Sequence, residues 1–138
     1  MIYPKLAFTC TSGKRLNLFI GMMNSFLRCC KDTDLISSWF IYDDGSSEND
    51  LIEMNKLFPF LTILKNNIGG QYNSLNMLFE KANTEWAFHC EDDWFFIKED
   101  NFIRKMFDIV SENERIKNVI LRNWMPFDKN FLKITKSN

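Results

Sequence analysis

Two groups of carboxylates stand directly after apolar runs of the chain. Asp43 and Asp44 follow residues 39–42, and the acidic triplet 91–93 follows residues 86–90. Consecutive carboxylates repel one another, and a hard divalent cation with oxygen ligands relieves that repulsion. The triplet therefore indicates a metal site, with a solvated acidic turn as the alternative.

Short polar side chains accompany these acids. Asp43 and Asp44 can accept hydrogen bonds from a base N–H or from ribose hydroxyls. Thr9, Thr11 and Ser12 end another apolar run and can line the same crevice. Ordinary turn chemistry is the alternative for each hydroxyl.

Two common phosphate-binding patterns are missing from the first loop. Residues 9–15 contain only Gly13, whereas a dinucleotide-binding loop needs GxGxxG. The Gly13-Lys14 pair also lacks the upstream glycine and the following Ser or Thr of a Walker loop. The sequence therefore disfavours NAD and P-loop chemistry.

Hydrophobic periodicity predicts the elements that position these residues. Strands are expected at residues 6–11, 38–42, 61–64, 86–90 and 119–121. Helices are expected at residues 16–27, 51–57, 75–82 and 102–110, and the tail from Lys133 shows no pattern. This alternation predicts an α/β fold with a mainly parallel central sheet. Both acidic groups then fall at strand carboxyl ends, on the edge that borders the ligand crevice.

The composition limits the class of protein and the kinds of partner that this sequence can have. The chain has 138 residues, 17 Lys plus Arg against 18 Asp plus Glu, and 46% hydrophobic residues, as expected of a single globular domain. The near-neutral charge gives no broad field for nucleic acid, and no apolar stretch approaches the roughly 20 residues of a membrane helix. The four cysteines form no CxxC pair, and residues 1–5 resemble no signal peptide, so we expect buried free thiols and a cytoplasmic location.

Three blocks of the sequence resemble the nucleotide-sugar glycosyltransferases of the GT-A fold, particularly the inverting family 2. Residues 40–47 resemble that family's strand ending in V-D-D-G-S. Residues 67–70 with Asn76 resemble its N-x-G-G segment followed by A-R-N. Counting on without a gap, Glu91 and Asp93 fall on the two acids of the D-x-D motif.

The resemblance implies a Rossmann-like GT-A sandwich, small or truncated, that binds a nucleotide-diphosphate sugar, a UDP-sugar being favoured. It also implies that Mn²⁺ or Mg²⁺ neutralises the leaving group and that the sugar passes to an acceptor hydroxyl with inversion. Asp93 and Glu91 would be the metal ligands. The donor-binding residues would be Thr9, Thr11, Ser12, Arg15, Asp43, Asp44, Asn67, Gly69, Gly70, Asn76 and Glu91. Asp92 should point away from the site, because successive residues of an extended chain alternate sides.

The chain departs from the family pattern in two places. Leu75 replaces a common arginine, so Arg15 or Lys14 would meet the diphosphate instead. The donor half covers about residues 5–97 of a single domain 1–138, which leaves a shortened acceptor side at 98–138. Asp128 is the only late acid in a loop-like setting and is the candidate base.

Several alternatives remain open at this stage. The chain could be a noncatalytic or incomplete nucleotide-sugar-binding module of a larger glycosyltransferase. It could instead be a sugar-1-phosphate nucleotidyltransferase, although only residues 13–15 hint at the basic loop that this needs. His89 is expected to pack within its strand rather than bind metal, and Trp94 could be a sugar platform or a core residue. The acceptor, whether carbohydrate, lipid-linked or protein, is not indicated.

Overall fold

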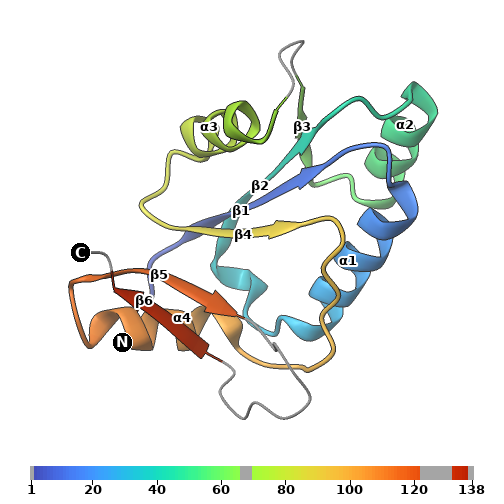
Figure 1. The fold of residues 1–138 in the computed structure, drawn as a ribbon. Helices are drawn as coiled ribbons and strands as arrows, with labels where there is room; N and C mark the ends of the chain where they lie inside the picture. The colour runs from blue at the N-terminus through green and yellow to red at the C-terminus, as the bar shows by residue number, and fades with distance from the viewer. Residues whose placement is uncertain (1, 66–69, 122–131, 137–138) are drawn as a thin grey trace.

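The computed structural model of the chain describes residues 2–65, 70–121 and 132–136. The strands are β1 (Leu6–Ser12), β2 (Ile36–Asp43), β3 (Thr62–Leu64), β4 (Ala87–Glu91), β5 (Ile116–Leu121) and β6 (Leu132–Lys136). The helices are α1 (Leu16–Cys29), α2 (Glu48–Leu57), α3 (Gln71–Ala82) and α4 (Phe102–Ser111), with a 3-10 turn η1 (Thr33–Leu35). Every predicted strand and helix is present with shifted ends, and the α/β fold class is confirmed (Figure 1).

A four-stranded parallel sheet forms the centre of the fold, with strand order β3-β2-β1-β4. In the register, Ser12 pairs with Asp43 of β2, and Thr11 pairs with Glu91 of β4. The strand ends predicted to carry chemistry are therefore direct neighbours. The expectation of a mainly parallel sheet is correct.

Helices cover both faces of this sheet. Phe8 of β1 lies on the α1 face, where its ring centroid is 4.8 Å from that of Phe26. The next residue, Thr9, points to the opposite face and contacts His89, whose ring lies 6.1 Å from Phe79 of α3. Because neighbouring strand residues alternate, α1 and α3 lie on opposite faces of β1 and β4.

Local signals set the bounds of α2. The side chain of Ser47 accepts a hydrogen bond from the Asp50 backbone N–H at 3.2 Å, the N-cap that the sequence predicts. The helix ends at Leu57, two residues before Pro59, which cannot continue it. Gly45, at φ 83°, takes the left-handed turn between β2 and this helix.

The C-terminal part of the chain corrects one expectation. The tail from Lys133, read as patternless, contains β6, which pairs antiparallel with β5 through Val119 and Ile134. These two strands form a separate sheet and do not extend the parallel one. The partner of an edge strand depends on long-range pairing, which local hydrophobic alternation does not encode.

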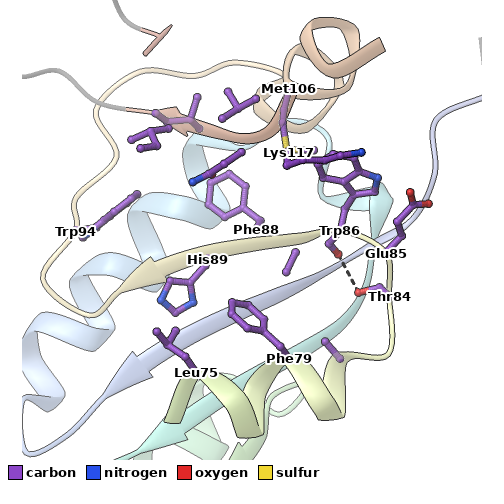
Figure 2. Close-up of a pocket in the computed structure, with 16 residues that line it drawn as sticks. Leu75, Phe79, Thr84, Glu85, Trp86, Phe88, His89, Trp94, Met106 and Lys117 are labelled. Atoms are coloured by element: carbon purple, nitrogen blue, oxygen red, sulfur yellow. Dashed lines mark hydrogen bonds between the residues drawn. The ribbon is translucent and has the colours of Figure 1, made fainter. Parts of the chain in front are cut away.

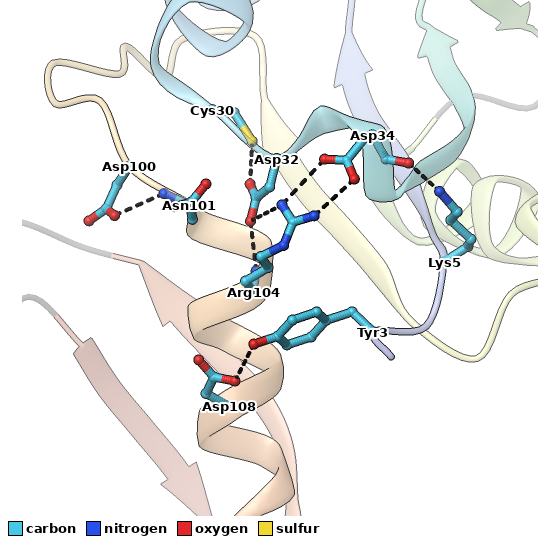
Figure 3. A network of polar contacts seen from close by, with 9 residues as sticks. All are labelled: Tyr3, Lys5, Cys30, Asp32, Asp34, Asp100, Asn101, Arg104 and Asp108. Atoms are coloured by element: carbon cyan, nitrogen blue, oxygen red, sulfur yellow. Dashed lines mark hydrogen bonds and ion pairs between the residues drawn. The ribbon is translucent and has the colours of Figure 1, made fainter. Parts of the chain in front are cut away.

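A polar network fixes α4 at the amino ends of the central strands (Figure 3). The fully buried carboxylate of Asp32 accepts the backbone N–H of Arg104 at 2.7 Å. The Arg104 guanidinium donates to Asp34 at 2.9 Å, and the Tyr3 hydroxyl donates to Asp108 at 2.8 Å. These contacts lie at the edge of the sheet opposite the carboxyl ends.

All four cysteines are free and buried, as expected from the sequence. Burial raises the pKa of the Cys10 thiol well above its ordinary value, and burial with the nearby Asp32 raises the pKa of Cys30 to about 12. These thiols therefore stay protonated at neutral pH. Within the described ranges, no helix is long and apolar enough to cross a membrane.

Candidate functional site

The carboxyl ends of β2, β1 and β4 bring the predicted residues to one edge of the sheet. The backbone N–H of Asp44 donates to the Ser12 carbonyl at 2.8 Å, which joins the loop after β2 to the end of β1. Gly13 lies so close to this loop that an added Cβ would be 2.6 Å from the Asp44 carbonyl oxygen. The two loops therefore need a glycine at this position to pack.

Asp43 and Asp44 differ in exposure. Asp43 is 2% exposed, and its Oδ2 accepts the backbone N–H of Ser46 at 2.9 Å. Its Oδ1 is buried and has no hydrogen-bond partner within the part of the chain that the structure describes. Asp44 is exposed at the surface of the same loop. The pair thus combines one half-satisfied buried carboxylate with one open carboxylate.

Asp92 has both carboxylate oxygens occupied. Its Oδ2 accepts the Ser12 hydroxyl at 3.0 Å and the Arg15 Nε at 3.2 Å, while Oδ1 forms an ion pair with Arg15 Nη2. Asp92 is fully buried, whereas the Arg15 side chain is 48% exposed. This two-point contact ties the loop after β1 to the loop after β4.

This geometry corrects the expectation that Asp92 points away from the site. The expectation rested on alternation along an extended chain, but Asp92 lies in the turn that follows β4. Its carboxylate contacts Ser12 and Arg15, and both are predicted donor-binding residues. A basic residue just after one strand and an acidic triplet after another were the only sequence signals of this contact.

Asp93 and Glu91 are the predicted metal ligands. Asp93 is 47% exposed, and its Oδ2 lies 3.8 Å from Arg15 Nη1. Glu91 ends β4 and is partly buried. Among the described residues, no three histidine, cysteine or acidic side chains are grouped to hold a metal ion. Asp93 and Glu91 offer oxygen ligands of the kind that hard divalent cations prefer.

The other predicted donor-binding residues fall in three settings. Thr9 is fully buried, and its hydroxyl lies 3.0 Å from His89 Nδ1, so this side chain does not reach the crevice. Thr11 is partly buried beside Glu91. Gly70 is the N-cap residue before α3, with φ 109°, and Asn76 is exposed on that helix. Three predicted site residues lie outside the part of the chain that the structure describes: Asn67, Gly69 and the candidate base Asp128.

His89 packs within the sheet, as expected. Its ring lies between Thr9 of β1 and Phe79 of α3. Burial lowers the pKa of His89 below its ordinary value of 6.5. The imidazole is therefore neutral at pH 7.

A cavity of about 900 Å³ runs beside β4, between α3 and β5 (Figure 2). Leu75 and Phe79 of α3 and His89 of β4 line one side, and Lys117 of β5 lies across from them. Trp94, next to Asp93, stands at the end of the cavity near the acidic loop. Trp94 also packs partly against the core, so both predicted uses of this ring remain compatible with its position.

The architecture is the Rossmann-like α/β fold found in glycosyltransferases. No protein-family model matches the sequence, and no curated protein matches it. Several solved structures have a similar fold. One is the mannosyltransferase PcManGT from Pyrobaculum calidifontis in complex with GDP-Man and Mn²⁺, with a TM-score of 0.58 and 14% identity over 74% of this chain.

Further similar structures are those of TarS from S. aureus. The full TarS structure gives a TM-score of 0.59 and 15% identity over 78% of this chain. TarS 1–349 in complex with UDP gives a TM-score of 0.57 and 12% identity over 83% of it. This chain spans 32% of the mannosyltransferase and 20% of the full TarS chain. At these identities the similarity shows the fold alone.

Proposed function

We propose that this chain binds a nucleotide-diphosphate sugar together with Mn²⁺ or Mg²⁺ and transfers the sugar to an acceptor hydroxyl. A UDP-sugar is the favoured donor, and inversion the favoured outcome. The observation that carries the proposal concerns Oδ1 of Asp43, which is buried at the ligand edge of the sheet and has no hydrogen-bond partner among the described residues. A buried carboxylate oxygen without a donor costs about 1–3 kcal/mol or more, and a nucleoside N–H or hydroxyl would remove that cost.

The charges at the edge support a diphosphate beside this nucleoside. Asp93 has an open carboxylate, and the exposed part of the Arg15 guanidinium is adjacent to it. A divalent cation on Asp93 and Glu91 would neutralise the negative charge that the leaving nucleoside diphosphate gains. Asp43 and Asp44 would orient the nucleoside, and Trp94 would offer a ring face to the sugar.

The first test measures thermal unfolding with UDP or GDP in the presence of Mn²⁺, Mg²⁺ or excess EDTA. A diphosphate at a hundredfold excess over Kd should raise the free energy of unfolding by about 2.7 kcal/mol, seen as a Tm rise of several degrees. An equal rise in Tm with EDTA would show that binding does not need the cation. No rise in Tm with either diphosphate would contradict nucleotide binding.

Variants then separate the roles of the acids. Asp93→Asn should abolish the metal-dependent part of binding, and Asp44→Ala should weaken binding of the nucleoside itself. Because the Asp93 side chain is 47% exposed, its replacement should change stability by less than about 0.5 kcal/mol. Glu99→Gln is the matched control, since Glu99 is an exposed carboxylate paired with Lys31. Binding without measurable sugar transfer would favour the binding-module alternative.

A further inference from the structure

Arg15 is held in one orientation by a buried carboxylate. Asp92 is fully buried and contacts Arg15 through both of its oxygens, and the Ser12 hydroxyl completes its hydrogen bonds. The contact uses the Nε and Nη2 edge of the guanidinium. The remaining nitrogen, Nη1, lies 3.8 Å from the half-exposed Asp93.

We propose that Asp92 is a positioning residue that holds Arg15 as the cationic contact for the donor diphosphate. The inference rests on the proposed function and adds a role to a residue that the sequence places outside the site. Arg15 presents an open edge beside the carboxylate expected to share its cation with the same phosphate oxygens. An arginine fixed before the ligand arrives loses less side-chain entropy on binding than a free one.

The charges of the acidic triplet are consistent with this role. Glu91, Asp92 and Asp93 carry three formal negative charges, and Arg15 compensates one of them through Asp92. Two negative charges of the triplet remain for a divalent cation. With Leu75 facing the cavity beside β4, α3 contributes no cation from that position.

The test compares each diphosphate with its own nucleoside, UDP with uridine and GDP with guanosine, by calorimetric titration in Mn²⁺. Asp92→Asn should weaken diphosphate binding by about tenfold or more and leave nucleoside binding within about twofold, because only the phosphate contact is lost. Arg15→Gln should give the same pattern. In the double variant the two losses should not add, because both changes break one contact.

Two further variants control for folding. Arg15→Lys changes a half-exposed side chain, keeps the charge and loses the two-point contact, so it should also weaken the diphosphate selectively. Asp32→Asn is the matched buried control, since Asp32 is fully buried and accepts from Arg104 at the opposite edge of the sheet. It should lower stability and leave the ratio of diphosphate to nucleoside affinity unchanged.

The outcomes separate this inference from the proposed function. Equal weakening of nucleoside and diphosphate in Asp92→Asn would show a purely structural role and overturn the inference. If Arg15→Gln and Arg15→Lys bind the diphosphate with wild-type affinity, the inference is also overturned, whereas the proposed donor site is not contradicted. If wild-type protein binds neither UDP nor GDP, the proposed function fails and the inference with it.

Discussion

His89 is the only histidine of the chain, and it sits on the face of β4 that α3 covers. Its pKa is lowered by burial, whereas the unfolded chain has the ordinary value near 6.5. As pH falls below about 6.5, the unfolded chain binds a proton that the native state does not. The free energy of unfolding should therefore fall, by at most about 1.4 kcal/mol per pH unit.

This prediction is measured by urea unfolding at pH 7.5, 6.5 and 5.5 for wild type and His89→Gln. Wild type should lose more stability than the variant over this range. Asp34 beside Arg104 and Asp100 beside Lys105 have pKa values below their ordinary 3.8, so they do not titrate there. Equal pH slopes in the two proteins would contradict a buried neutral imidazole.

At the scale of elements, the close approach of the loops after β1 and β2 depends on Gly13. A Cβ at this position would meet the Asp44 backbone, which cannot move without breaking its 2.8 Å hydrogen bond to the Ser12 carbonyl. Gly13→Ala should therefore destabilise the protein by about 1–3 kcal/mol, the usual cost of overpacking. It should also weaken nucleotide binding, because it displaces Asp44.

Gly21→Ala is the matched substitution, and its effect should have the opposite sign. Gly21 lies inside α1, and an added Cβ would have no atom within 4 Å. Alanine there should stabilise the protein by about 0.5–1 kcal/mol, because glycine loses more backbone entropy in a helix. Chemical denaturation measures both variants. A neutral Gly13→Ala would show that the two loops can separate without cost.

At the scale of the whole molecule, one aromatic side chain joins α1 to three strands of the sheet. The Phe26 ring lies 4.8 Å from Phe8 of β1, 5.2 Å from Phe88 of β4 and 6.0 Å from Trp39 of β2. Phe26→Ala should lower the free energy of unfolding by about 3–5 kcal/mol, the range for a large buried ring. Unfolding in denaturant should still occur in a single transition, with its midpoint at a lower denaturant concentration.

Leu18→Ala provides the comparison on the same helix. Leu18 is 47% exposed, so its truncation should cost about 1 kcal/mol or less. Similar losses for the two variants would mean that the cluster around Phe26 does not hold the layers together.

The sequence by itself determined the elements and the edge where chemistry is placed. Alternation and helical periodicity predicted the parallel α/β class, and Ser47 with Asp50 marked the start of α2. Acids after two strands predicted a shared polar edge, because parallel strands end on the same side of a sheet. These signals are local, since each depends on residues a few positions apart.

Only the tertiary structure decided which of these residues meet. Arg15 and Asp92 are 77 positions apart, and their contact depends on the pairing of β1 with β4. Thr9 and Asp43 are both polar residues in strands. The Thr9 hydroxyl contacts His89 inside the sheet, whereas one oxygen of Asp43 has no partner in the part of the chain that the structure describes. Burial and pairing arise from contacts between distant segments, which hydrophobic periodicity along the chain does not specify.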